Sequence, residues 1–116
     1  MEEKDCLFCK IVRKEIPSEI FFESENFISI RDIHPISEGH SLIISKKHYK
    51  NLLDFPNLLG NELINTAKEV FFKIQKETKC EGFNLVQNNF AVAGQIINHL
   101  HFHIIPRKKN DGVHLG

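Results

Sequence analysis

The chain has 116 residues and a mass of 13.5 kDa, which is enough for one compact domain. Its 41% hydrophobic and 26% charged residues exclude a disordered or collagen-like chain. Fifteen basic residues balance fifteen acidic ones, so the formal net charge is zero and no broad basic surface is available. We therefore expect neither nucleic acid nor a membrane as a partner.

The N-terminal half predicts one short helix and three strands. After a polar lead over residues 1–5, apolar residues recur at helical spacing from Leu7 to Glu15, and Pro17 ends the run. β-Favouring residues then predict a two-stranded hairpin, a loop and a third strand. These segments are Ile20–Phe22, Phe27–Ile30, the loop Asp32–Gly39 and Ser41–Ser45.

The C-terminal half predicts one long helix and two further strands. Residues 57–79 place an apolar stripe opposite charged side chains, which indicates an amphipathic surface helix. The remaining segments are a strand over Phe83–Gln87, a loop over Asn88–Ile97 and a strand over His99–Ile105 closed by Pro106. We expect the charged tail beyond Arg107 to be mobile unless a partner holds it. This order predicts a single α+β domain over residues 1–116, with polar tails at 1–5 and 107–116 and a mainly antiparallel sheet.

The cysteines and the N-terminal residues indicate in which cellular compartment the protein is expected. Cys6 and Cys9 are close in sequence and Cys80 is left over, which does not suit a secreted disulfide framework. No apolar stretch has the form of a signal peptide or approaches the roughly 20 residues needed to cross a bilayer. We expect a soluble, cytoplasmic protein.

Three of the seven histidines alternate with apolar residues near the C-terminus. On a strand, His99, His101 and His103 would share one face, while Leu100 and Phe102 would face the core. Three imidazoles on one sheet face need polar partners, and a substrate is a natural one. The spacing alone also allows an exposed polar face or a three-histidine metal centre.

Further polar groups accompany these histidines. Asn88, Gly94 and Gln95 precede them, and amide groups of this kind hold phosphate oxygens without net charge. Asp32 follows a predicted strand, where a carboxylate could bind a ribose diol. We also expect His40 to support the triad. Each of these residues is a weak indication of a nucleotide site on its own, and their order in the chain makes the indication stronger.

Together these blocks resemble the histidine-triad (HIT) family, in particular its small Hint-type phosphoramidases and their bacterial relatives. The resemblance covers nearly the whole chain. It is carried by His99-Leu100-His101-Phe102-His103-Ile104-Ile105, by Phe8-Cys9-Lys10-Ile11-Val12 with Glu15-Ile16-Pro17-Ser18, by Asp32-Ile33 with Pro35, by Gly39-His40-Ser41-Leu42-Ile43-Ile44 with Lys46-Lys47-His48, and by Gly94-Gln95. It implies a HIT-like fold, with a five-stranded antiparallel sheet, one short and one long helix, and a homodimer.

The resemblance also implies a reaction. His101 would attack the α-phosphorus of a purine nucleoside phosphoramidate or related conjugate of the AMP or GMP type. Water would then release the nucleoside monophosphate from a covalent nucleotidyl-histidine, and no catalytic metal is required. The catalytic residues would be His101, His103, His99 and Gln95. The nucleotide site would comprise Asp32, Ile33, Phe8, Ile11, Asn88, Gly94, Gln95 and His103.

Two departures from the family pattern bear on activity. Ile96 stands where the family commonly has Ser or Thr, whose hydroxyl meets the phosphate or the leaving group. The C-terminal tail lacks the Trp that helps to shape the Hint site. Two alternatives therefore stay open: a dinucleoside polyphosphate hydrolase or nucleotidyl transferase, and a nucleotide-binding regulatory module with little activity.

A second site is suggested by Cys6 and Cys9, which have the spacing of half a zinc knuckle. The spacing alone equally allows two thiols packed as small hydrophobic groups. The resemblance to bacterial family members implies a structural zinc ion held by Cys6, Cys9, His48 and His99.

Overall fold

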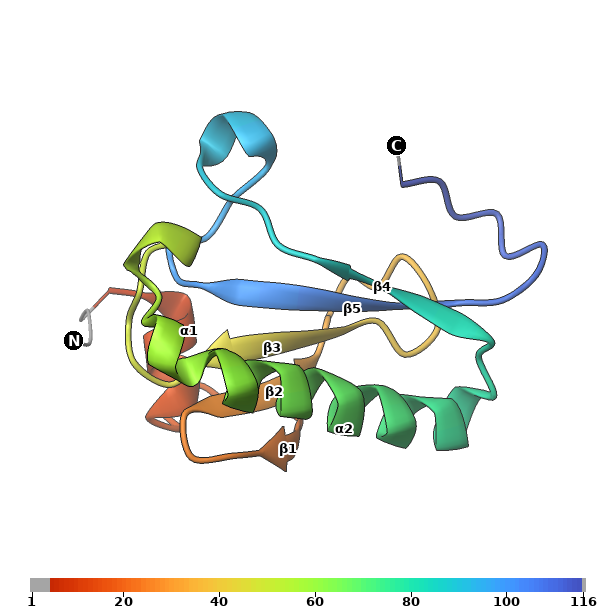
Figure 1. Cartoon of the computed structure of the whole chain (residues 1–116), viewed down its shortest axis with the longest axis horizontal. Coiled ribbons are helices and arrows are strands. Elements are labelled where there is room, and N and C mark those ends of the chain that lie inside the picture. The colour runs from red at the N-terminus through yellow and green to blue at the C-terminus, as the bar shows by residue number, and fades with distance from the viewer. Residues whose placement is uncertain (1–4, 116) are drawn as a thin grey trace.

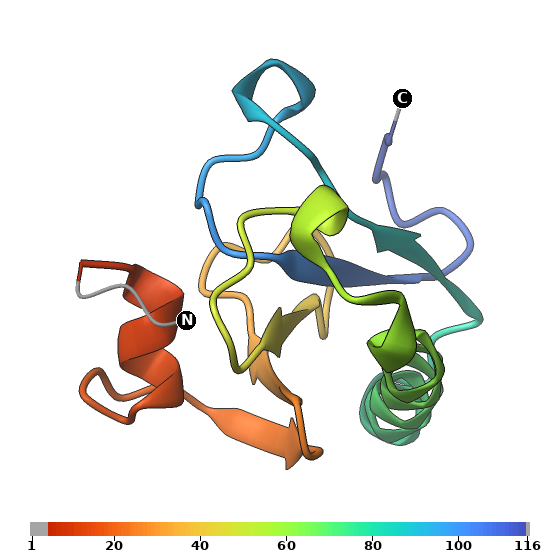
Figure 2. The ribbon, with the colours of Figure 1, turned by 60° about the vertical axis from the view of Figure 1, so that its left-hand side comes forward.

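The computed structural model describes residues 5–115, which form one antiparallel sheet between two helices. The elements are α1 (Leu7–Val12), β1 (Ile20–Glu23), β2 (Phe27–Arg31), β3 (Ser41–Ser45), α2 (Gly60–Thr78), β4 (Gly82–Val86) and β5 (His101–Arg107), with 3-10 turns at Leu52–Asp54, Asn57–Leu59 and Ala91–Ala93. The strands lie in the order β1-β2-β3-β5-β4. Figures 1 and 2 show α1 on one face of the sheet and α2 on the other. The expected α+β fold, with five antiparallel strands, one short helix and one long helix, is confirmed.

Alternation along the central strands sends apolar side chains to both faces of the sheet. Toward α2, the sheet residues Phe27, Ile43 and Ile104 pack with Val70 and Ile74. Toward α1, the packed residues are Ile28, Ile30, Leu42 and Ile44 from the sheet with Phe8 and Ile11 from the helix. Because both faces are covered, the interior of β3 is apolar at every position.

Both helices are shorter than the apolar spacing predicts. α1 ends at Val12 rather than Glu15, since the chain turns at Lys14, which has a φ of 64°. The predicted long helix becomes α-helical only at Gly60, because residues 57–59 form a 3-10 turn. Its C-terminal end lies close to the predicted position, as Thr78 is the last helical residue.

The last strand differs from its prediction at both ends. β5 begins at His101, so that His99 lies before the strand, and it continues through Pro106 to Arg107. Pro106 is tolerated because the pairing with β3 ends at Ile104, and no strand on that side then requires the missing N–H. The prediction that Pro106 closes the strand is therefore wrong.

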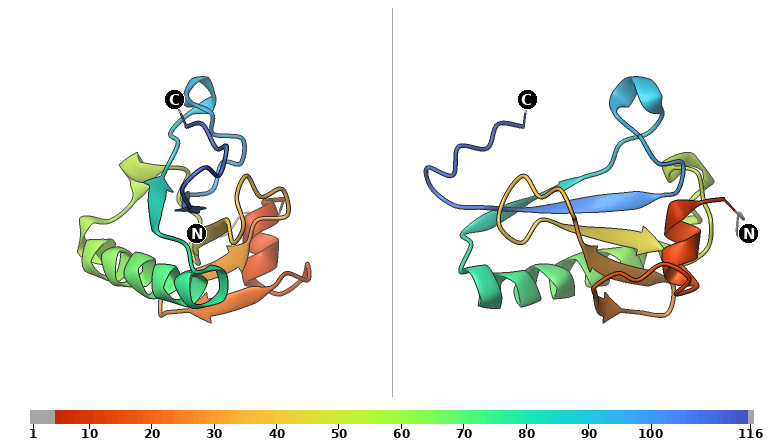
Figure 3. Two further views of the ribbon diagram at one scale, coloured as in Figure 1. Left: turned by 90° about the vertical axis from the view of Figure 1, so that its right-hand side faces the viewer. Right: turned by 180° about the vertical axis from the view of Figure 1, so that it is seen from behind.

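The tail beyond β5 is tied to the body of the protein. Arg107 Nε donates to Asp111 Oδ2 over 2.8 Å, and Arg107 Nη2 donates to the Val113 carbonyl over 2.9 Å. Figure 3 shows the tail turning back beyond the end of β5. No partner molecule is needed for these contacts. Of the predicted polar lead, residues 1–4 lie outside the described residues. Between residues 5 and 115, no helix combines the length and the apolar character needed to span a membrane.

Candidate functional site

The start of β5 carries two of the three triad histidines on the face that α1 covers. His101 pairs with Ile44 and His103 pairs with Leu42, so both imidazoles share a face with these apolar side chains. The ring centroids of His101 and His103 lie 5.3 Å apart. The alternation argued from the sequence therefore holds for this pair.

His99 is fully buried where the chain enters β5. Its Nε2 lies 2.7 Å from the carbonyl oxygen of Ser45. A carbonyl can only accept, so Nε2 carries the proton and Nδ1 keeps its lone pair. Burial lowers the pKa of His99 to about 4, which keeps the ring neutral near neutral pH. His99 thus presents an unprotonated Nδ1 atom toward α1.

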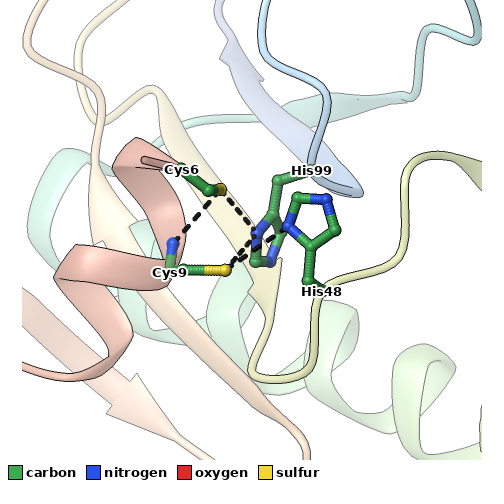
Figure 4. A group of neighbouring side chains, drawn as sticks. All are labelled: Cys6, Cys9, His48 and His99. Atoms are coloured by element: carbon green, nitrogen blue, oxygen red, sulfur yellow. Dashed lines mark hydrogen bonds between the residues drawn. The ribbon is translucent and has the colours of Figure 1, made fainter. Parts of the chain in front are cut away.

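Four side chains from three segments meet around that Nδ1 atom (Figure 4). Cys6 caps the N-terminus of α1, and Cys9 lies one turn further on the same side of the helix. Cys6 Sγ lies 3.1 Å from His99 Nδ1, and Cys9 Sγ lies 3.5 Å from it. Cys9 Sγ is also 3.4 Å from Nδ1 of His48. The ligating atoms of all four residues lie within 4.8 Å of one another.

This spacing fits a tetrahedral metal ion. Zinc bonds of about 2.3 Å to sulfur and about 2.0 Å to nitrogen place the two ligand atoms about 3.5 Å apart at a tetrahedral angle. The sulfur–nitrogen separations in the cluster run from 3.1 to 3.5 Å. Two thiolates and two imidazoles complete the coordination shell, which leaves no position for a substrate. The cluster can therefore hold a metal ion in a closed, structural site.

His101 is held in the tautomer that carries its proton on Nδ1. Its Nδ1 lies 2.7 Å from the carbonyl oxygen of His99 and must donate to it, which leaves a lone pair on Nε2. The ring of Phe8 packs edge-to-face against it, with centroids 5.0 Å apart. Burial lowers the pKa of His101, so the imidazole stays neutral near neutral pH.

A chain of hydrogen bonds gives His103 the opposite tautomer. The Ile36 N–H donates to His40 Nδ1 over 3.2 Å, which leaves the proton of neutral His40 on Nε2. That Nε2 donates to His103 Nδ1 over 3.0 Å, so the proton of His103 lies on its own Nε2. Burial and the neighbouring histidines lower the pKa of His103 to about 4. His101 therefore offers a lone pair where His103 offers a hydrogen-bond donor.

Asp32 lies at the outer end of this chain. Its Oδ2 is 3.4 Å from His40 Nε2. Burial lowers the pKa of His40 despite the nearby carboxylate, so the contact joins a neutral ring to an anion. Asp32 is thereby positioned on the triad side of the loop that connects β2 to β3.

The loop before His99 is shaped by the side chain of Gln95. Its carboxamide oxygen accepts from the Phe90 N–H over 2.8 Å, and its nitrogen donates to the carbonyls of Lys50 and Ile97 over 2.6 and 3.1 Å. Gln95 is only 5% exposed, so its amide serves the loop itself. A contact between Gln95 and a phosphate stays a prediction.

The same loop contains two residues in left-handed backbone regions. Phe90 has φ 74° and ψ 153°, a conformation that few residues other than glycine adopt. Gly94 has φ 97°, and a Cβ there would lie 3.6 Å from the side-chain nitrogen of Asn88. Asn88 and Gly94 are thus neighbours, as their proposed shared role at a phosphate requires. Ile96 follows with 92% of its surface exposed.

The residues predicted to contact a nucleoside differ in accessibility. Ile33 is 85% exposed. Beside it, Asp32 Oδ1 accepts from the His34 N–H over 2.9 Å. Phe8 and Ile11 lie on the same face of the sheet as His101 and are 3% and 6% exposed, so they offer little surface to a base. The structure connects Asp32 to the triad and places Phe8 against it.

The groups that fix the histidine tautomers were not anticipated from the sequence, apart from the His40 side chain. They are the carbonyls of Ser45 and His99 and the N–H of Ile36. Every residue has such main-chain groups, so no signal in the sequence could have singled them out.

Comparison with known proteins identifies the family. Residues 13–110 match the HIT domain family. The chain belongs to the HIT family. Its resemblance to that family, argued from sequence blocks, is thereby confirmed.

Among the relatives of this HIT protein, several have names that state an activity. It is 43% identical over 109 residues to adenylylsulfatase HINT3 from Arabidopsis thaliana, covering 94% of this chain and 55% of the relative. It is 39% identical over 103 residues to adenosine 5'-monophosphoramidase HNT1 from Saccharomyces cerevisiae, covering 89% of this chain and 63% of the relative. The chain therefore spans less than two thirds of either relative.

Solved HIT structures share the fold. SMU.412c from Streptococcus mutans superposes with a TM-score of 0.93 at 36% identity, covering 99% of this chain and 73% of the other. A zinc-bound histidine-triad protein from Mycobacterium smegmatis superposes with a TM-score of 0.89 at 30% identity, covering 96% of this chain and 81% of the other.

Proposed function

We propose that this HIT protein hydrolyses purine nucleoside phosphoramidates or related nucleotide conjugates through a nucleotidyl-histidine at His101. The observation that carries the proposal is the tautomer of His101, whose Nδ1 donates to the His99 carbonyl over 2.7 Å. This bond leaves a neutral Nε2 lone pair beside the Nε2–H of His103. The relatives named adenosine 5'-monophosphoramidase and adenylylsulfatase support a nucleotide substrate cleaved at the α-phosphate.

In the first step, His101 Nε2 forms a bond to the α-phosphorus, and the bond from phosphorus to the leaving group breaks. The leaving amine takes a proton from solvent. The ring now carries a positive charge, and the His99 carbonyl stabilises it through the Nδ1–H bond. The Nε2–H of His103 donates a hydrogen bond to a phosphate oxygen or to the leaving group. Water then attacks phosphorus and gives up a proton to solvent, the bond to His101 breaks so that the lone pair returns to Nε2, and nucleoside monophosphate leaves.

The nucleotide would lie along the triad face. We assign the ribose hydroxyls to Asp32, which is linked to the triad through His40. The exposed Ile33 would cover one side of the base, with the edges of Phe8 and Ile11 beneath it. Asn88, Gly94 and Gln95 would hold the phosphate side, Gln95 chiefly by shaping the loop.

Intact mass measurement during incubation with an adenosine phosphoramidate tests the reaction. Wild-type protein should gain the mass of one AMP transiently and release AMP, and His101→Gly should do neither. His114→Gly is the matched control, since His114 is exposed in the tail. A wild-type protein that binds AMP but forms no adduct and shows no turnover would contradict the proposal.

The exposed Ile96 favours one alternative, a nucleotide-binding regulatory module with little activity. Replacing a hydroxyl at this position removes a polar contact worth on the order of 10²-fold in rate. The regulatory alternative predicts nucleotide affinity without an adduct, so the same mass measurement distinguishes the two. A dinucleoside polyphosphate hydrolase would form the same adduct, but faster from dinucleotides than from phosphoramidates.

We further propose that Cys6, Cys9, His48 and His99 hold one structural zinc ion. The sulfur–nitrogen spacings and the zinc-bound relative support this assignment. Zinc would fix α1 to the sheet and take no part in the chemical steps. Metal analysis of the purified protein should give one zinc per chain, and Cys9→Ser should lower that ratio.

We also propose a homodimer that covers the free edge of β4. Phe83 and Leu85 on this strand are 38% and 49% exposed, and Phe72 on the neighbouring helix is 56% exposed. An exposed apolar edge strand is a ready surface for a second copy. Light scattering should give twice the mass of one chain, and Leu85→Lys should shift it toward a monomer.

A further inference from the structure

The cluster of Cys6, Cys9, His48 and His99 is connected to His101 by the chain itself. His99 contributes its side chain to the cluster, with Nδ1 3.1 Å from Cys6 Sγ. The carbonyl oxygen of the same residue accepts the Nδ1–H of His101 over 2.7 Å. Any rotation of the His99 backbone therefore changes the acceptor that sets the tautomer and direction of the His101 ring.

A second connection runs through Phe8, which lies between the two cysteines in sequence. Its ring packs edge-to-face on His99 and on His101, with centroids 5.8 and 5.0 Å away. Phe8 is only 3% exposed, so it has little room to move while α1 stays in place. The ring thus restricts rotation of the His101 imidazole on the side where the two rings touch.

The position of α1 depends on its attachments. A helix of six residues has too few internal hydrogen bonds to be stable on its own. Its apolar face packs on β2 and β3, and its N-terminal turn is attached through Cys6 and Cys9 to His48 and His99. Releasing the cysteines would leave Phe8 and α1 held only by apolar packing on β2 and β3.

We infer that the Cys/His cluster and Phe8 are positioning groups for the nucleophile, beyond any part they have in stability. With a metal ion on the cluster, Phe8 and the His99 carbonyl hold the His101 ring with Nε2 toward the substrate. Without it, α1 loosens and the His101 ring turns. The effect on rate rests on the proposed reaction, whereas the effect on the ring does not.

His103 provides an internal control on the same strand. Its Nδ1 is held by His40 Nε2 over 3.0 Å, and His40 is held in turn by the Ile36 N–H. None of these groups belongs to the cluster or to α1. A selective positioning role therefore predicts that His101 loses order while His103 keeps it, whereas a general loss of stability loosens both.

The test compares the imidazole signals of His101 and His103 in protein labelled with ¹⁵N-histidine, with zinc bound and after removal by a chelator. We expect the His101 Nδ1–H signal to weaken or vanish on chelation, with the His103 signals retained. Adduct formation from an adenosine phosphoramidate should slow about tenfold or more, since small misplacements of reacting groups have effects of this size. The affinity for AMP should fall by a smaller factor than the rate of adduct formation, because only the base contacts of Phe8 and Ile11 lie on α1. The groups that we assign to the ribose and the phosphate lie outside α1 and the cluster.

A variant pair tests the inference with the metal in place. Phe8→Leu keeps an apolar side chain but removes the ring, and we expect it to retain one zinc per chain while the His101 signal weakens. Leu7→Ala is the matched control on the same helix, where Leu7 is 43% exposed. If chelation unfolds the chain, this pair alone decides the question.

The inference is overturned if the His101 signal persists after chelation and in Phe8→Leu, or if His101 and His103 loosen equally. The two proposals fail separately. If no form of the protein gives an adduct, the proposed reaction is wrong, and the imidazole signals still decide whether the cluster positions His101.

Discussion

Gly39, the residue before His40, should be among the positions least tolerant of a methyl group. Its φ of 87° lies in the left-handed region, where an L side chain costs about 1–2 kcal/mol. An added Cβ would also lie 2.9 Å from Ile74 Cγ2 and 3.0 Å from Thr78 Cγ2. Both are β-branched side chains buried on α2, so the methyl overpacks the core at about 1–3 kcal/mol. We expect Gly39→Ala to lower the free energy of unfolding by about 2–5 kcal/mol.

Urea unfolding of three Gly→Ala variants separates the two contributions. Gly112 has a φ of 74° with nothing within 4 Å, so its variant should lose only the backbone part, about 1–2 kcal/mol. Gly60 has a helical φ of −61° and equally open space, so its variant should gain up to about 1 kcal/mol. If Gly39→Ala loses no more than Gly112→Ala, the close approach of Ile74 and Thr78 does not matter and the reasoning is refuted.

Three further predictions concern the triad and its loop. Because burial lowers the pKa of His103 from 6.5 to about 4, its neutral form persists below pH 6.5. Burial also lowers the pKa of the nucleophile His101. Adduct formation should therefore stay level as the pH falls through 6.5 and decline only at lower pH, with bound metal measured at each pH. An acid limb at 6.5 would contradict this. Ile96→Ser should raise phosphoramidate turnover about tenfold to a hundredfold if the missing hydroxyl limits the rate, whereas Val92→Ser, a control of similar exposure in the same loop, should not. Phe90→Gly should leave the urea midpoint unchanged or higher because it relieves strain, whereas Ile64→Gly, equally exposed on α2, should lower the free energy of unfolding by about 1 kcal/mol.

The sequence predicted the fold well because its elements depend on local patterns. Apolar periodicity located α2 to within a few residues, and β-favouring runs located the strands. Local patterns failed where a neighbouring strand decides the outcome. The alternation of histidines placed His99 on β5, but the pairing with β3 begins only at His101. Pro106 belongs to β5 because β3 has already ended, which no pattern around the proline could reveal.

The site was predictable in its residue types and less so in their partners. Cys6, Cys9, His48 and His99 come together as the family resemblance implied. Gln95 illustrates the limit, since an amide beside a glycine could face a phosphate or its own loop. Here its polar groups bond to main-chain groups of Phe90, Lys50 and Ile97. The chemistry of a side chain limits what it can bind, whereas the packing of the folded loop determines which partner it binds.

The hydrogen bonds also predict how many metal ions the chain binds. Asp32, His40 and His103 have ligating atoms within 4.8 Å of one another, which by proximity alone would indicate a second metal site. The Ile36 N–H donates to His40 Nδ1, however, so the proton of neutral His40 must lie on Nε2, the atom that faces the other two residues. A metal there would require that proton to move to Nδ1, where it would oppose the Ile36 N–H.

His99 has the opposite arrangement, because its proton points to the Ser45 carbonyl and its lone pair points into the cysteine cluster. Zinc titration followed by calorimetry should therefore saturate at one tight site per chain. His40→Ala should leave that stoichiometry unchanged, and Cys6→Ser should weaken binding. A second tightly bound zinc ion per chain that is lost in His40→Ala would show that the tautomers argued from these hydrogen bonds are wrong. The assignment of His103 Nε2 as a hydrogen-bond donor would then also be wrong.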